Sequence, residues 1–130
     1  LFQPSEHIPP GEVPDQEYPY LLSTGRILFH YNVTTPYSGG ISSVWDKEMA
    51  EVNAVDAEKL GIQTGSLVKV TSRRGQVTTA VRVTDRVLPG VIWMSFHYAS
   101  TPTNELTSAV LDPVTGTGEY KVCAVKIEPI

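Results

Sequence analysis

The sequence predicts a mainly β protein, a closed barrel of short strands with a few helical insertions. Two segments of alternating apolar and polar residues flank a turn at residues 73–75, and further apolar strands are expected at residues 91–96 and 122–127. Only residues 54–60 carry convincing helix signals. A chain of 130 residues, 41% of them hydrophobic, suits one domain with its own core, which excludes wholesale disorder.

Residues 1–19 differ in composition from the rest of the chain. They hold five prolines among four acidic residues, a composition that packs no core and prefers extended or polyproline conformations. We therefore divide the chain into a Pro-rich linker at residues 1–19 and one domain at residues 20–130. We expect the linker to be mobile up to about residue 17 in the isolated domain. Because the chain begins at Leu1 rather than Met, we expect an excised piece of a longer polypeptide.

The first strand contains Leu21 and Leu22 and leads into residues 24–33, the most informative stretch of the sequence. Gly25 permits close backbone approach or a positive φ, and Arg26 supplies a planar guanidinium suited to phosphate or to the edge of a heterocycle. This combination is typical of a ligand loop. The alternative is an ordinary strand-end turn with a surface arginine.

The following elements are a helix, a hairpin and two strands. Asn53 is the expected N-cap of the helix and Gly61 its C-terminal stop. Residues 66–72 and 77–84 both alternate in polarity, so they are expected to pair across the turn between them. The strand at residues 91–96 follows a Pro-Gly turn, and the strand at residues 122–127 closes the chain.

Composition excludes several classes of function. Ten basic residues against 14 acidic ones give a net charge of −4, which argues against a nucleic-acid-binding protein. No apolar run approaches the roughly 20 residues that span a bilayer, so we expect a soluble chain without a membrane segment. The single cysteine cannot form an internal disulfide, and we expect a cytoplasmic protein.

Metal binding and catalysis find little support in the sequence. The histidines and the cysteine lack the close paired spacing of zinc ligands, and Cys123 fits a buried apolar strand. No Gly-x-Ser-x-Gly turn is present. Gly65-Ser66 could in principle cleave itself to a pyruvoyl group, as in aspartate decarboxylases, but this dipeptide is common in turns before strands. We assign no metal ligand and no catalytic residue.

Polar and aromatic side chains gather at the expected ends of strands. Arg26 and His30 follow the first strand, Phe96 ends the fourth, Asn104 lies in a loop, and Lys121 opens the last. If these ends converge, they offer cations for phosphates, an amide that can donate and accept, and an aromatic face. This predicts a dinucleotide-type ligand site. The alternative for each residue is structural: core, turn or solvated surface.

Several motifs occur in order along the chain: residues 17–26 (EYPYLLSTGR), 30–31 (HY), 53–62 (NAVDAEKLGI), 65–70 (GSLVKV), 74–75 (RG), 89–91 (PGV), 104–107 (NELT) and 119–121 (EYK). The series closely resembles the C-terminal molybdopterin-dinucleotide-binding domain of the dimethyl-sulfoxide-reductase superfamily, and within it formate dehydrogenase alpha subunits. The resemblance covers nearly the whole chain from Tyr18 to Ile130. It implies a six-stranded double-psi β-barrel with short helical insertions.

The resemblance also implies a binding site for molybdopterin guanine dinucleotide. In the family, the matching positions close over pyranopterin dinucleotides, in the bis form, that hold molybdenum or tungsten. Residues 32–35 (NVTT) depart from relatives that have another histidine or a Ser-Gly pair there. The expected cofactor-binding residues are Thr24, Gly25, Arg26, His30, Tyr31, Asn32, Phe96, Asn104 and Lys121.

The implied function is that of a cofactor-binding domain in an oxidoreductase that oxidises formate to CO2. In the family the metal's cysteine or selenocysteine ligand, the catalytic histidine and any iron–sulfur cluster lie in earlier domains. The fragment alone is therefore expected to be inactive, with the remaining domains of the same catalytic subunit as partners. A second hypothesis is a protein-interaction barrel without cofactor, as in some AAA ATPases, which would not need its cations and amide at one end.

Overall fold

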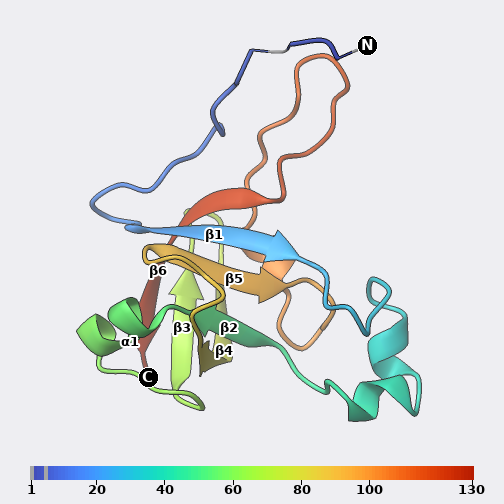
Figure 1. Cartoon of the computed structure of the whole chain (residues 1–130), viewed down its shortest axis with the longest axis vertical. Helices are drawn as coiled ribbons and strands as arrows, with labels where there is room; N and C mark the ends of the chain where they lie inside the picture. The colour runs from blue at the N-terminus through green and yellow to red at the C-terminus, as the bar shows by residue number, and fades with distance from the viewer. Residues whose placement is uncertain (1, 5) are drawn as a thin grey trace.

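The dominant feature of the computed structural model, which describes residues 2–4 and 6–130, is a closed six-stranded β-barrel (Figure 1). Its strands are β1 (Tyr20–Gly25), β2 (Met49–Val52), β3 (Leu67–Thr71), β4 (Gln76–Val83), β5 (Val91–Ser95) and β6 (Val122–Pro129). Around the barrel their order is β1-β5-β2-β4-β3-β6, with β1–β5 and β2–β4 parallel and the other four pairs antiparallel. This confirms the mainly β, six-stranded double-psi barrel.

The core fills the inside of this barrel. Inward-facing side chains alternate with outward-facing ones along β3 and β4, as the period of two requires. Leu22, Val70, Val81, Ile92 and Val125 come from five different strands and are fully buried. The strands therefore enclose a common apolar interior.

One strand, β2, was not expected from the residues alone. It has four residues, and Ala50, Glu51 and Val52 are all buried, so it shows no alternation of polarity. It runs directly into Asn53, the N-cap of the helix. A pattern this short carries no strand signal, and its conformation comes from pairing with β4 and β5.

The expected helix and hairpin are confirmed. In α1 (Ala54–Leu60), the Asn53 side chain accepts a hydrogen bond from Val55 N, and Gly61 ends the helix with φ 66°. The β3–β4 hairpin pairs Val70 with Val77. In its turn, Ser72 Oγ accepts from the backbone N–H of Arg74 at 3.1 Å.

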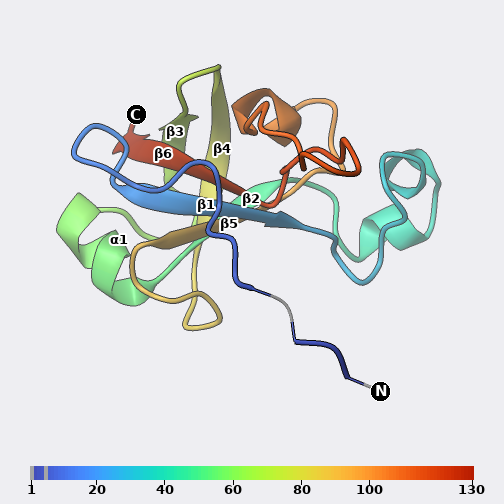
Figure 2. The same cartoon turned by 90° about the horizontal axis from the view of Figure 1, so that it is seen from above.

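The remaining elements of the described residues are three short 3-10 helices, η1 (Thr35–Tyr37), η2 (Ile41–Ser43) and η3 (Thr103–Leu106). The segment with η1 and η2 projects from the opposite side of the barrel to α1, as Figures 1 and 2 show. In the described part of the chain no helix has the length and apolar character needed to cross a membrane.

Residues 11–18, at the end of the expected linker, lie against the barrel. Gly11 N donates to Glu119 Oε2 at 3.0 Å, and the guanidinium of Arg73 lies 4.6 Å from the centre of the Tyr18 ring. Leu1 and Ser5, which the sequence also assigns to the linker, fall outside the described residues. The part of the linker nearest to the domain thus makes specific contacts with residues of the domain.

Candidate functional site

Strand order brings three chain segments to one edge of the barrel. Because β1 and β5 are parallel, with Gly25 opposite Ser95, both strands end at this edge. Because β6 is antiparallel to β1, with Ser23 opposite Val122, β6 begins there. The residues just after β1 and β5 and just before β6 are therefore neighbours, although about a hundred positions separate the first from the last.

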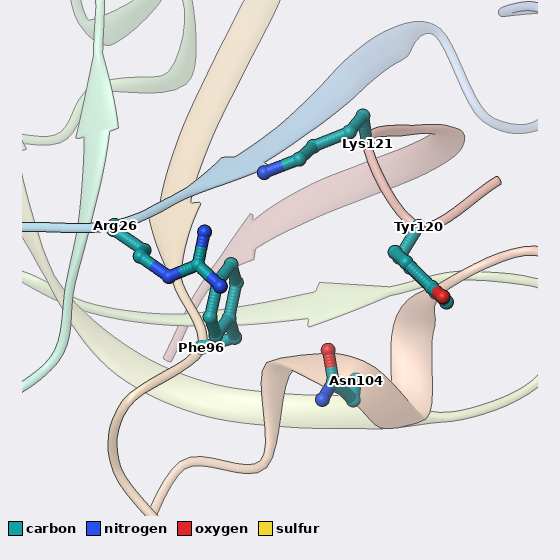
Figure 3. A pocket seen from close by; sticks show the side chains of 5 residues that line it. All are labelled: Arg26, Phe96, Asn104, Tyr120 and Lys121. Carbon is teal, nitrogen blue, oxygen red and sulfur yellow. The ribbon is translucent and has the colours of Figure 1, made fainter. Parts of the chain in front are cut away.

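A cavity of about 280 Å³ opens at this edge. Its lining combines two cations, an amide and two aromatic rings, and none of the lining residues is acidic. Figure 3 shows these side chains around the opening. They are Arg26, Phe96, Asn104, Tyr120 and Lys121.

Both cations lie beside one aromatic ring. The Arg26 guanidinium carbon is 5.4 Å and the Lys121 Nζ 5.3 Å from the centre of the Phe96 ring. A cation near an aromatic face is favourable. Two cations held together in an acidic chain form a local positive site, which suits an anion with extended rings.

Thr24 supports the Lys121 side of the cavity through two hydrogen bonds. Its Oγ1 donates to the Tyr120 carbonyl at 2.6 Å, and its own carbonyl accepts from Lys121 Nζ at 3.3 Å. Thr24 itself is only 4% exposed. This expected contact residue therefore holds the segment before β6 in place and does not line the cavity.

The loop after β1 is held in place by His97, a residue that the sequence analysis did not assign. Fully buried, His97 accepts a hydrogen bond from Ile27 N at Nε2 (2.9 Å), and its Nδ1 donates to the Asn32 carbonyl. Burial lowers the pKa of His97, which favours the neutral ring that this pairing requires. Asn32, with φ 49°, in turn accepts from Arg26 Nε at 2.9 Å.

His30 is not among the residues that line this cavity, and its role as a cofactor contact remains a prediction. It is 5% exposed, and its Nε2 lies 2.8 Å from the Trp45 carbonyl and 2.9 Å from the Tyr98 hydroxyl. Burial raises the pKa of Tyr98 to about 12, so this hydroxyl stays protonated and donates to the Trp45 carbonyl. The network ties the loop after β1 to the segment before β2.

Two further expected residues have other surroundings. A Cβ on Gly25 would lie 2.9 Å from Trp93 Nε1, so this glycine makes room for an indole. Its φ is not positive, contrary to one of the two uses expected for it. Tyr31 is 70% exposed and does not line the cavity. Their roles as cofactor contacts remain predictions.

Tyr120 also lines the cavity and is 52% exposed, although it is not among the expected cofactor-binding residues. A signal for it existed, because it stands inside the motif at residues 119–121 that contains Lys121. Among the residues that the structure describes, no group of three or more histidine, cysteine, aspartate or glutamate side chains is arranged to hold a metal ion. The cations, the amide and the aromatic rings that line the cavity are groups that can bind and orient an anionic heterocycle.

Comparison with known proteins gives a match over most of the chain. The family model "Molydopterin dinucleotide binding domain" matches residues 20–124. The alpha subunit of F420-dependent formate dehydrogenase 2 from Methanococcus maripaludis is 47% identical over 99% of this chain. The corresponding subunit from Methanocaldococcus jannaschii is 42% identical over 98%, and formate dehydrogenase H from Escherichia coli is 40% identical over 88%.

This chain spans about a fifth of the length of these relatives, 19% of the first two and 16% of the third. Among solved structures, acetylene hydratase from Pelobacter acetylenicus matches 87% of this chain and 18% of its own, with a TM-score of 0.72. At 16% identity, that likeness shows a shared fold.

Proposed function

Because the chain belongs to the molybdopterin dinucleotide binding domain family, we propose that it binds molybdopterin guanine dinucleotide as one domain of an oxidoreductase. The cofactor is the bis form, whose molybdenum or tungsten is held by other domains. The domain comprises residues 20–130, and the linker at residues 1–19 joins it to the rest of the same catalytic subunit. A cytoplasmic location belongs to the same proposal.

The cavity at the end of β1, β5 and β6 carries the proposal. Such a dinucleotide has several negative charges and hydrogen-bonding rings, so an acidic chain needs a local positive site to bind it. Arg26 and Lys121 supply that site, with no acidic side chain in the lining. Asn104 offers an amide that both donates and accepts, which suits the edge of a pterin or guanine ring.

Formate is the proposed substrate of the whole enzyme, with CO2 as product. Three relatives that match nearly all of this chain are named as formate dehydrogenase alpha subunits. The bound cofactor would supply the redox chemistry through its metal. The residues of this chain bind and orient the dinucleotide: Arg26 and Lys121 hold its charge, Asn104 holds a ring edge, and Phe96 fixes both cations.

The test is cofactor retention in the longer protein that contains this chain. Arg26→Ala and Asn104→Ala should each lower the bound pterin about tenfold after dialysis, since a charge-assisted or buried amide contact contributes on the order of 1.5–3 kcal/mol. Thermal stability should change little, because both side chains are exposed.

Lys47→Ala is the matched control, since it removes an exposed cation that does not line this cavity. It should leave pterin content unchanged. Unchanged pterin content in Arg26→Ala and Asn104→Ala as well would contradict the proposal and favour a protein-interaction barrel without cofactor.

A further inference from the structure

Asn104 reaches the cavity from η3, a one-turn helix that no strand pairing holds. The side chain of Leu106, at the end of η3, is fully buried in the core. Its carbonyl oxygen is held as well: it accepts from Arg74 Nε at 3.1 Å, from Arg74 Nη2 at 2.8 Å and from Cys123 Sγ at 3.3 Å. Two of these three donors belong to one guanidinium.

The β3–β4 turn approaches η3 at a second point. A Cβ on Gly75 would lie 3.0 Å from the carbonyl oxygen of Glu105 and 3.4 Å from its Cβ. The absence of a side chain at Gly75 therefore lets the turn pack against the η3 backbone. The turn thus contacts the residue that follows Asn104 and, through Arg74, the one after it.

Arg74 is itself fixed by the end of the linker. Its Nη1 and Nη2 donate to the two carboxylate oxygens of Glu12 at 2.5 and 3.1 Å. Glu12 is anchored in turn, since it also accepts from Ala124 N in β6 at 2.7 Å. The Arg74 and Glu12 side chains are 26% and 13% exposed. The planar fork of an arginine can bond both oxygens of a carboxylate and a carbonyl in one fixed geometry, whereas a lysine ammonium places its three donors on a single rotating nitrogen.

We propose that Arg74 is a positioning residue for the cavity: by holding the Leu106 carbonyl, its guanidinium sets the place of η3 and thereby of Asn104. Arg74 does not line the cavity and acts through Asn104. The proposal rests on the proposed binding of a dinucleotide at this cavity. According to this proposal, the β3–β4 turn and Glu12 also affect dinucleotide binding, although neither lines the cavity.

The test is a double-mutant cycle on pterin retention in the longer protein. Arg74→Lys keeps the charge near Glu12 but loses the planar fork that bonds Glu12 and the Leu106 carbonyl in one fixed geometry, so it should speed pterin release about fivefold to tenfold. In the Asn104→Ala background it should change the release rate less than twofold, because the side chain that it positions is already gone. An equal effect in both backgrounds would show a general structural role and overturn the proposal.

Arg73→Lys is the matched control. Arg73 lies next to Arg74 and pairs with Glu12 and Asp15 of the linker, but it makes no hydrogen bond to η3 in the described structure. It should leave pterin release unchanged. If it matched the effect of Arg74→Lys, attachment of the linker would explain the loss and the proposal would fall.

Gly75→Ala keeps the Arg74 guanidinium, but its added methyl group would displace the backbone of η3. It therefore tests the position of Asn104 by a second route if Arg74→Lys does not fold. It should speed release in the wild-type background and have no effect beside Asn104→Ala; equal effects in both would again overturn the proposal. If Asn104→Ala alone left release unchanged, this inference and the assignment of Asn104 would fail together. A loss with Asn104→Ala but none with Arg74→Lys or Gly75→Ala would remove only the inference.

Discussion

Gly25 and Trp93 show how a single contact fixes the edge of the cavity. Gly25 is the last residue of β1, and the indole of the neighbouring strand β5 lies where its side chain would be. Arg26 follows at once and turns toward Phe96. The close packing of Gly25 therefore determines where the chain leaves the barrel and from which point Arg26 starts.

Gly25→Ala should destabilise the domain by about 1–3 kcal/mol, the usual cost of an added methyl group in a packed site. The new Cβ would meet Trp93 Nε1 at 2.9 Å and Cζ2 at 3.2 Å, so the indole must move. Urea unfolding followed by tryptophan fluorescence measures both the loss and the shift of the ring.

Gly39→Ala provides the comparison, because nothing lies within 4 Å of its added Cβ and its φ is not positive. It should stay within about 0.5 kcal/mol of wild type. If Gly25→Ala behaved in the same way, the contact with Trp93 would not determine the conformation of this edge.

At the scale of residues, sequence predicted what each strand end carries but not what each residue touches. Arg26, Phe96 and Lys121 meet because their positions follow from strand order, which the family resemblance supplied, whereas Asn104 reaches them from η3. His30 has the same polar character, yet its partners come from distant segments that no local pattern reveals. Burial of a polar side chain is decided by tertiary packing.

At the scale of elements, β2 is the short strand that closes the barrel against β5. Only two residue pairs, Glu51 with Trp93 and Val52 with Ile92, form its ladder with β5. Beyond them the Glu48 side chain continues the connection, since Oε1 accepts from Ser95 N at 2.8 Å and Oε2 bonds to Ser95 Oγ. A side chain thus replaces the backbone ladder where the strands diverge. A strand of four residues is too short for its sequence to reveal either the ladder with β5 or the hydrogen bonds from Glu48.

Glu48→Gln should stabilise the protein above neutral pH by about 1 kcal/mol, because its amide keeps both bonds to Ser95 without a buried charge. Burial raises the pKa of Glu48 above its usual value in the folded state. Glu48 therefore contributes its full stabilisation of the fold below the pKa that it has in the unfolded chain. This stabilisation is lost as pH rises through the pKa that Glu48 has in the folded protein. Urea unfolding from pH 4 to pH 8 should show the two proteins diverging as pH rises.

Glu58→Gln is the control for that series, since Glu58 is exposed on α1. Its stability should follow wild type at every pH. A gain from Glu48→Gln that was the same at pH 4 and pH 8 would contradict the buried carboxylate as its cause.

At the scale of the whole molecule, ion pairs connect the linker to the barrel. Composition predicted a mobile segment as far as residue 17, because prolines and acidic residues pack no core. The structure gives two of those acidic residues partners in the β3–β4 turn: Glu12 pairs with Arg74 and Asp15 with Arg73. Ion pairs between residues 58 and 62 positions apart leave no periodic signal, so composition could not locate them.

Acid should therefore release residues 11–18 from the barrel. The hydrogen bond from Arg74 lowers the pKa of Glu12 below its usual value in the folded state. The stabilisation by Glu12 is then present above the unfolded pKa and is lost as pH falls through the folded pKa. Amide ¹⁵N relaxation on the isolated chain should report residues 11–18 as rigid at pH 7 and mobile on the nanosecond scale near pH 3, with residues 6–10 mobile at both.

Glu12→Gln separates this charge from other effects of acid. It should loosen residues 11–18 already at pH 7, at a cost of about 1–2 kcal/mol in unfolding free energy, and its difference from wild type should vanish near pH 3. Asp15 is protonated by acid in both proteins, so its effect on the linker cancels when the two are compared. Rigid residues 11–18 in Glu12→Gln at pH 7 would mean that the backbone contact of Gly11 with Glu119 and the packing of Tyr18 on Arg73 hold the linker without the charge.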